Sequence, residues 1–282
     1  MEQKTVEIGS VKISNKLPFA LVCGPCQIES KQHSIDICGA MIEITKELEI
    51  PYIFKASFDK ANRSSVSGAR GVGFEKGMET FDEIKKLYNN IPIVTDVHES
   101  HQCAEVAKHV DMLQIPAFLC RQTDLLIAAA KTGKVVNIKK GQFMAPEDMV
   151  NAVKKCTDNG NDKVCLTERG TSFGYHTLIV DMTGFPVMAK TTGCPVIFDA
   201  THSEQKPGGL GTATGGNREM APVLARAAIA AGIGGIFMET HENPDKALSD
   251  GPNTIALKDI KAILAYLKEY DALTKTKITD YY

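Results

Sequence analysis

Eight short apolar runs recur along the chain, and stretches with helical periodicity separate them. The runs lie at residues 18–23, 51–56, 91–95, 111–115, 134–138, 163–167, 195–199 and 234–238. Near-continuous apolar runs are typical of parallel strands buried on both faces, and a helix between two runs is the crossover that parallel pairing needs. Eight such units predict an α/β protein with a (β/α)8 TIM barrel.

The start of the chain has a different pattern. Residues 6–14 alternate apolar and polar positions around Gly9 and Ser10, which predicts a short β-hairpin. We expect this hairpin to cover the N-terminal mouth of the barrel. The amphipathic stretch from residue 255 to about 270 completes the eighth unit. Because no linker or low-complexity tract interrupts the chain, we expect residues 1–282 to form one catalytic domain, with residues 1–16 as a hairpin extension.

Composition argues against some classes of binding partner and indicates the cellular compartment. A net charge of −2 provides no basic field that would attract nucleic acid or an anionic membrane surface. No apolar stretch approaches the ~20 residues of a membrane span, and the first ten residues lack the pattern of a signal peptide. The eight cysteines are scattered, which predicts reduced, buried thiols for most of them rather than a disulfide framework. Cys26 is the exception, because it follows Gly-Pro at a strand end and lies outside an apolar run. We therefore expect a cytoplasmic protein.

A polar or charged residue stands at or just past the end of each apolar run. These residues are Cys26, Lys55, Asp96, Gln114, Lys139, Arg169, His202 and Glu239. In a barrel of parallel strands all of these ends meet on one face, so they predict a single site there. Serine and aspartate at helix starts, such as Ser30 and Asp124, are expected to cap the helices that follow.

Two long loops follow strand ends on the same face. Residues 58–77 include Lys60, Asn62, Arg63, Ser64 and Ser65, a mixture of cationic and hydroxyl donors that favours phosphate binding over a plain solvated loop. Residues 203–219 are rich in glycine but lack the order of a Walker loop, and we expect them to form a mobile lid.

Cationic residues are concentrated at this face. They are Lys55, Lys60, Arg63, Arg121, Lys139, Lys140 and Arg169. In a nearly neutral chain this concentration predicts a substrate with several negative charges, such as two phosphoryl groups or a phosphate and a carboxylate. Ion pairing with Asp59, Asp96, Glu99 and Glu168 is the competing interpretation, and it accounts for part of the charge only. Lys140 is expected to point away, because neighbours on a strand alternate faces.

A second constellation offers donors for a metal ion. Cys26, His202, Glu239 and Asp250 supply one sulfur, one nitrogen and two oxygen ligands, a set that suits Fe²⁺, Zn²⁺ or Mn²⁺ better than Mg²⁺ or Ca²⁺. These residues have no local spacing rule, so buried or hydrogen-bonded roles stay open on spacing alone. His98 and His241 are rival ligands, whereas His33, His101, His109 and His176 are expected to be peripheral.

Eight motifs in order carry a resemblance to a known family over nearly the whole chain. They are GPCQIES at 24–30, FKASFDKANRSS at 54–65, TDVHE at 95–99, QIPAFLCRQTDL at 114–125, NIKKGQF at 137–143, ERGTSFGY at 168–175, FDATHS at 198–203 and METHENPDKALSDGPN at 238–253. Together they resemble the 3-deoxy-D-manno-octulosonate 8-phosphate (Kdo8P) synthase family. The resemblance implies an enzyme that condenses phosphoenolpyruvate with D-arabinose 5-phosphate and water, giving Kdo8P and phosphate for lipopolysaccharide synthesis.

The resemblance also implies roles for individual residues. Lys60, Lys139 and Arg169 are expected to bind the phosphate and carboxylate of phosphoenolpyruvate, with Lys55 and Gln114 nearby. Asn62, Arg63 and Ser64 are expected to hold arabinose 5-phosphate. Arg121 is expected to help from a neighbouring subunit of a homotetramer.

The family has a metal-dependent branch with cysteine in its first motif, and the presence of Cys26 implies that branch. The implied ligands are Cys26, His202, Glu239 and Asp250, and no organic cofactor is implied. Lys60 and His202 are expected to stabilise charge that develops during the reaction, and Asp96 and His98 to handle protons near the aldehyde.

Three other functions stay open at this point. A 3-deoxy-7-phosphoheptulonate synthase would use erythrose 4-phosphate, but it usually carries a KPRTS-like motif where this chain has KANRSS at 60–65. A Schiff-base aldolase could use Lys55 or Lys139 as its nucleophile. A phosphosugar sensor would bind both ligands without releasing phosphate.

Overall fold

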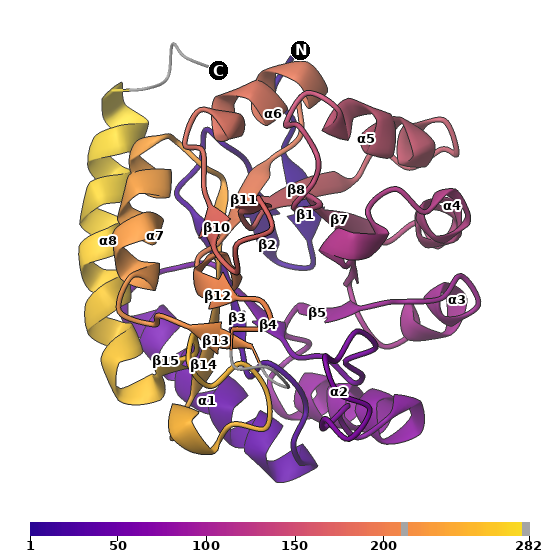
Figure 1. Cartoon of the computed structure of the whole chain (residues 1–282), viewed down its shortest axis with the longest axis vertical. Coiled ribbons are helices and arrows are strands. Elements are labelled where there is room, and N and C mark those ends of the chain that lie inside the picture. The colour runs from indigo at the N-terminus through magenta and orange to yellow at the C-terminus, as the bar shows by residue number, and fades with distance from the viewer. Residues whose placement is uncertain (210–213, 278–282) are drawn as a thin grey trace.

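A computed structural model describes residues 1–209 and 214–277, and it shows the predicted barrel (Figure 1). Its eight parallel strands are β3 (Ala20–Gly24), β4 (Tyr52–Lys55), β5 (Ile93–Asp96), β6 (Met112–Ile115), β7 (Val135–Lys139), β8 (Val164–Glu168), β11 (Val196–Asp199) and β14 (Gly235–His241). Each strand pairs with its sequence neighbour, and pairing of β11 with β14 and of β14 with β3 closes the cylinder. The prediction of a (β/α)8 TIM barrel is confirmed.

The strands read as apolar runs because both of their faces are buried. On β3, Leu21 and Cys23 belong to the apolar layer between the strands and the helices, whereas Ala20 and Val22 belong to the interior of the barrel. This alternation follows from the two-residue period of a strand. All five residues of β3 are buried, so sequence periodicity alone could not distinguish the two faces.

Helices cover the outside of the barrel (Figure 1). They are α1 (Lys31–Glu47), α2 (Phe74–Leu87), α3 (Gln102–Val106), α4 (Thr123–Lys131), α5 (Met149–Thr157), α6 (Gly184–Thr192), α7 (Ala221–Ala230) and α8 (Leu257–Lys277). Ser30 caps α1 as predicted, because its side chain accepts a hydrogen bond from the amide of His33. The prediction that Asp124 is a cap is wrong. Gln122 occupies that position, and Asp124 lies in the first turn, where the helix dipole favours its charge.

The N-terminal hairpin closes one end of the cylinder. Strands β1 (Val6–Ile8) and β2 (Val11–Ile13) pair antiparallel around Gly9, whose positive φ of 56° suits the turn. Their apolar side chains belong to the same buried cluster as the residues inside the barrel. Gly9 packs against Pro92, just before β5, and Ser14 lies against Gly234, just before β14. The hairpin therefore lies at the N-terminal ends of the strands.

Short elements extend the other end of the barrel. They are β9 (Thr171–Ser172), β10 (Leu178–Ile179), β12 (Gln205–Lys206), β13 (Gly215–Gly216), β15 (Ile255–Ala256) and the 3₁₀ turns η1 (Ala117–Leu119), η2 (His202–Glu204) and η3 (Pro244–Lys246). In the predicted lid, β12 pairs antiparallel with β13, and residues 210–213 between them lie outside the described part of the chain. No helix within residues 1–209 and 214–277 is long and apolar enough to cross a membrane.

Candidate active site

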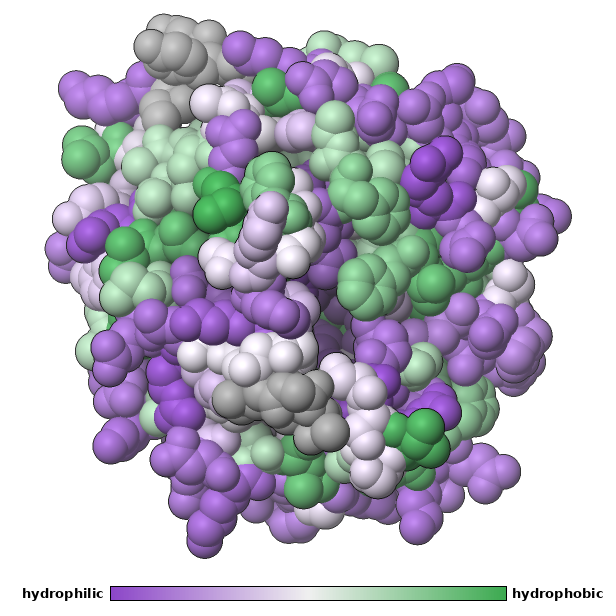
Figure 2. All heavy atoms as spheres, viewed as in Figure 1, coloured by the Kyte–Doolittle hydropathy of each residue, from purple (hydrophilic) through white to green (hydrophobic). Residues whose placement is uncertain are grey.

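A cavity of about 620 Å³ opens at the C-terminal ends of the strands. Figure 2 shows this face hollowed near its centre, with hydrophilic residues in and beside the hollow and hydrophobic residues on its upper right side. Twelve of the predicted site residues line the cavity: Lys55, Lys60, Asn62, Arg63, Ser64, Asp96, His98, Gln114, Lys139, Arg169, His202 and Asp250. Cys26 and Glu239 are buried and do not line it, and Arg121 is exposed outside it. Gln205 and Arg218 from the second long loop also line the cavity. The structure thus brings together residues of both long loops and residues from the segments that follow seven of the eight strands.

Lys55 ties the first strands of the barrel to the last one. Its backbone lies close to Gly24 at the end of β3, where a Cβ atom would collide with the backbone carbonyl of Lys55. The buried Lys55 ammonium donates to the carbonyl of Cys26 at 3.2 Å, to Ser57 Oγ at 3.0 Å and to Glu239 Oε1 at 3.3 Å. Its donors are fully used inside the protein, which fits a bridging role better than that of a Schiff-base nucleophile.

Asp96 lies at the end of β5 in a network of buried polar groups. It accepts hydrogen bonds from Ser57 and Gln114, and Asn137 Nδ2 in turn donates to Gln114 Oε1 at 3.0 Å. Burial opposes ionisation of Asp96, but the charges of nearby lysines, first of all Lys55, outweigh it and hold the pKa of the carboxyl well below its usual range. Asp96 is therefore a carboxylate acceptor at neutral pH and cannot donate a proton.

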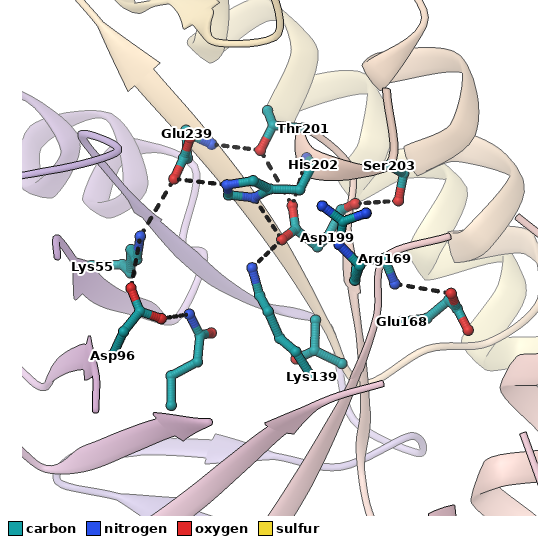
Figure 3. Close-up of polar contacts among 12 residues, drawn as sticks. Lys55, Asp96, Lys139, Glu168, Arg169, Asp199, Thr201, His202, Ser203 and Glu239 are labelled. Carbon is teal, nitrogen blue, oxygen red and sulfur yellow. Dashed lines mark hydrogen bonds and ion pairs between the residues drawn. The ribbon is translucent and has the colours of Figure 1, made fainter. Parts of the chain in front are cut away.

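Asp199, at the end of β11, joins two of the predicted site residues (Figure 3). It accepts a hydrogen bond from Lys139 and contacts His202 Nδ1 at 2.7 Å. Burial opposes its ionisation, yet the charges of His202 and Lys139 hold the pKa of Asp199 well below its usual range. Burial lowers the pKa of Lys139, and Asp199 opposes this effect. Lys139 also lies 4.3 Å from the centre of the Phe237 ring, a cation–π contact.

Sequence reasoning missed Asp199 although the motif FDATHS contains it. A carboxylate at a strand end, three residues before a histidine, was the available signal. The residue was overlooked because its partner Lys139 belongs to a distant strand, β7.

Two cationic side chains at the cavity have unused donors. Within the described residues, the Lys60 ammonium has no hydrogen bond or ion pair of its own. Burial favours its neutral form, but the charges of Cys26, Glu239, Asp96 and Asp250 outweigh burial and raise the pKa of Lys60. Arg169 is 5% exposed and donates to Gln205, while its Nη1 is buried without a partner. A buried donor without a partner, such as Arg169 Nη1, is costly, and the half-buried Lys60 carries an unpaired positive charge, so both groups favour an anionic ligand.

The loop of residues 58–77 reaches across the mouth of the cavity. Arg63 donates to Ser249 Oγ at 2.7 Å and to the carbonyl of Leu248 at 2.9 Å, which ties this loop to the segment after β14. Asp59, one of the acidic residues considered as ion-pair partners, pairs with Arg70, which was not among the cations considered. The guanidinium of Arg63 is therefore held at the cavity wall by two neutral oxygens, and no carboxylate in the described residues neutralises it.

Lys140 does not line the cavity, in agreement with the alternation of faces. It is nevertheless 1% exposed, because it lies 3.4 Å from Glu168 and donates to Thr171 Oγ1 at 3.3 Å. Glu168 also accepts from the amides of Arg169 and Gly170 at 2.9 and 2.6 Å. This buried pair fixes the backbone that presents Arg169 to the cavity.

The four predicted metal ligands converge. One donor atom from each of Cys26, His202, Glu239 and Asp250 lies within 4.8 Å of the others. Cys26 Sγ is 3.2 Å from Asp250 Oδ2, and His202 Nε2 is 3.4 Å from Glu239 Oε1. Glu239 Oε2 is buried and has no hydrogen-bond partner. The Asp199 contact with His202 Nδ1 is the outer-shell arrangement that orients a ligating imidazole.

Sulfur, nitrogen and oxygen donors at this separation fit a divalent transition metal. Burial and the charge of Glu239 raise the pKa of the Cys26 thiol well above its usual value. A divalent cation would reverse that balance, because it supplies positive charge and favours the thiolate. The donor set is therefore chemically consistent with a metal centre.

The remaining histidines differ in whether they line the cavity. His98 lines the cavity, its Nδ1 is buried without a partner, and burial lowers its pKa against the charge of Asp96. His241 does not join the Cys26 set and instead groups with Glu29 and His33. His109 pairs with Asp82 away from the cavity. The expectation that His202 is a better ligand candidate than its rivals agrees with this arrangement.

Comparison with known proteins places the chain in a family. The sequence profile of the DAHP synthetase I family matches residues 2–276. The chain belongs to the DAHP synthetase I family. A 2-dehydro-3-deoxyphosphooctonate aldolase of Bradyrhizobium sp. (strain ORS 278) is 58% identical over 275 residues, which cover 98% of this chain and 96% of the relative.

Two further relatives give the same picture. Proteins with the same name from Rhodopseudomonas palustris (strain BisB5) and Nitrobacter winogradskyi are 57% and 56% identical over 272 and 270 residues. In both comparisons the match covers 96% of this chain and 94% of the relative.

Proposed function

We propose that this chain is a Kdo8P synthase, the enzyme also called 2-dehydro-3-deoxyphosphooctonate aldolase. It condenses phosphoenolpyruvate with D-arabinose 5-phosphate and water to give Kdo8P and phosphate. The observation that carries the proposal is one cavity in which the unpartnered donors of Lys60 and Arg169 lie with Lys139, while Asn62, Arg63 and Ser64 line the same cavity. The name of the relatives, at 56–58% identity, agrees with a site for two anionic substrates.

The anion-binding groups are proposed to form two sets, one for each substrate. Lys60, Lys139 and Arg169 bind the phosphate and carboxylate of phosphoenolpyruvate, with Lys55 and Gln114 fixing the surrounding network. Asn62, Arg63 and Ser64, from the loop after β4, bind the phosphate of the sugar. This arrangement sets the aldehyde of the sugar against C3 of phosphoenolpyruvate, because each substrate is held by its own phosphate.

The reaction forms a bond between C3 of phosphoenolpyruvate and the aldehyde carbon, adds water at C2, and then breaks the C2–O bond to phosphate. Lys60 and Lys139 stabilise negative charge that develops at these positions in a preorganised site. Asp96 stays ionised, so it orients donors by accepting hydrogen bonds, whereas the neutral imidazole of His98 can pass a proton at the aldehyde end. This refines the shared role that the sequence predicted for the two residues.

A divalent metal is the cofactor that the site fits. Cys26, His202, Glu239 and Asp250 would hold it, with Fe²⁺, Zn²⁺ or Mn²⁺ as suitable ions. When bound, such an ion supplies Lewis acidity toward water or a carbonyl oxygen. The presence of cysteine at position 26 supports membership of the metal-dependent branch. Asp199 keeps His202 oriented toward the set.

The working form of the protein is proposed to be a cytoplasmic homotetramer, with residues 1–282 acting as one catalytic domain. Arg121 is exposed and lies outside the cavity of its own chain, which supports its use at the site of a neighbouring copy. All eight cysteines are free and buried, which supports a reducing compartment.

Phosphate release tests the proposal. The full chain is incubated with phosphoenolpyruvate and either arabinose 5-phosphate or erythrose 4-phosphate, before and after treatment with a chelator. We expect release with the five-carbon sugar, loss after chelation, and recovery when a divalent ion is returned. Activity with erythrose 4-phosphate alone would instead favour a 3-deoxy-7-phosphoheptulonate synthase, and binding of both ligands without phosphate release would favour a sensor.

A further inference from the structure

A second group of metal-ligating side chains lies outside the active-site cavity. Glu29, His33 and His241 each offer a donor atom, and these three atoms lie within 4.8 Å of one another. Glu29 comes from the segment after β3, His33 from the first turn of α1 and His241 from the end of β14. None of them belongs to the Cys26 set or lines the cavity. The reaction proposed above assigns no role to this group.

The group contains buried nitrogen atoms without partners. His241 is 4% exposed, and its Nε2 has no hydrogen-bond partner within the described residues although Glu29 Oε1 lies 3.5 Å away. His33 Nδ1 is likewise buried without a partner. The two imidazole rings are 4.7 Å apart, centre to centre. A buried polar atom without a partner has a cost in free energy, and a cation shared by both nitrogens would remove it.

A carboxylate stands behind both imidazoles. Glu242 Oε2 is 2.8 Å from His33 Nε2 and 3.2 Å from His241 Nδ1, so it faces the ring nitrogens opposite the unpartnered ones. At His33 this is the outer-shell pattern of a ligating histidine, in which a carboxylate accepts the second ring N–H. His241 Nδ1 instead accepts a hydrogen bond from the amide of Asn243 at 2.9 Å. Metal binding therefore requires the Nδ1 proton to face Glu242 and this amide contact to lengthen.

We propose that Glu29, His33 and His241 form a second site for a divalent transition metal, with Zn²⁺ as the best-suited ion. Two imidazoles and one carboxylate are a set that zinc commonly takes in proteins, with a further position open to water. The buried imidazoles favour such an ion over Mg²⁺ or Ca²⁺, which prefer oxygen ligands throughout.

The second site is connected to the first through the chain. Glu29 follows Cys26 by three residues, and His241 follows Glu239 by two. Glu29 Oε1 accepts from the amide of Leu248 at 2.9 Å, two residues before Asp250. An ion at the second site fixes Glu29 and, through it, the segment that carries Asp250. The second ion would thus stabilise the position of the segment that supplies Asp250 to the Cys26 set.

Metal counting tests this proposal without reference to any reaction. The full chain is stripped with a chelator, dialysed against Zn²⁺ and analysed for bound metal, with circular dichroism to show that each variant is folded. We expect two ions per chain in the wild type, one in Cys26→Ala and one in His33→Gln. His33 suits this test because it lies in the first turn of α1 and its side chain is partly exposed, at 14%. Glu29→Gln is the second variant and is expected to bind one ion.

His109→Gln is the matched control. His109 also contacts a carboxylate, that of Asp82 in α2, at 2.8 Å, but it belongs to no metal-ligating group in the described residues. It should retain two ions. With Co²⁺ in place of Zn²⁺, the near-ultraviolet thiolate band should vanish in Cys26→Ala and persist in His33→Gln. One ion in the wild type, or an unchanged count in both His33→Gln and Glu29→Gln, would overturn the proposal.

Discussion

Replacing Asp199 with asparagine is the sharpest test of how the site is held together. The substitution keeps the shape of the side chain but removes the charge that faces Lys139 and His202. Asp199 is fully buried, and Lys139 is 7% exposed, so the lysine would be left as a buried charge without its counterion. Breaking a buried ion pair from one side costs about 3–5 kcal/mol of unfolding free energy. For a chain of this size that corresponds to a fall in Tm on the order of 10 °C.

Urea unfolding followed by circular dichroism measures this cost, since the chain contains no tryptophan for fluorescence. The measurement is made with a chelator present, so that metal binding does not contribute. Asp82→Asn is the control, because Asp82 also contacts a histidine, His109, at 2.8 Å but is exposed. A loss below about 0.5 kcal/mol is expected there.

The pH dependence has a definite sign. The pKa of Asp199 is held below its ordinary value of 3.8, so its contribution to stability is present above that pH and declines as the pH falls further. The difference in unfolding free energy between the wild type and Asp199→Asn should therefore become smaller at acidic pH. Loss of the negative charge beside His202 Nδ1 should also weaken metal binding by about 10–100-fold. A variant as stable as the wild type at neutral pH, with unchanged metal affinity, would refute the view that Asp199 organises these two residues.

Other substitutions test separate parts of the site. Lys139→Ala should abolish turnover through lost phosphoenolpyruvate binding, and steady-state assays with near-normal kinetics would contradict that assignment. His98→Gln should lower kcat by about 10²–10⁴-fold. In the wild type, activity should fall as the pH drops through the pKa of His98, which lies below 6.5, and a pH–rate profile of the variant that keeps this limb would argue against His98 as the proton carrier. Gly24→Ala should cost about 1–3 kcal/mol, because its Cβ would collide with the backbone carbonyl of Lys55, and thermal unfolding at the wild-type Tm would exclude such a clash.

The barrel could be predicted from the sequence because each of its strands is buried on both faces and stands alone as an apolar run. The hairpin could also be predicted, because buried and exposed residues alternate strictly in the two strands on either side of Gly9. The residues at the strand ends followed from the same rule, as parallel strands place all their C-terminal ends together.

What the sequence could not provide was the pairing across the cavity. Asp199 and Lys139 are sixty residues apart, and Gln205 links Arg169 to Asp250 through contacts that depend on the three-dimensional path of the loops. His33, expected to be peripheral, lies beside His241 because α1 follows β3, which pairs with β14. These contacts depend on the closure of the barrel, so the spacing of residues along the sequence does not reveal them.

The hairpin of β1 and β2 gives the barrel a floor. Because apolar side chains fill that end, ligands have a single route in and out, at the opposite rim. The hairpin therefore fixes the side of the barrel from which ligands enter the cavity, although its own strands lie at the far end of the cylinder.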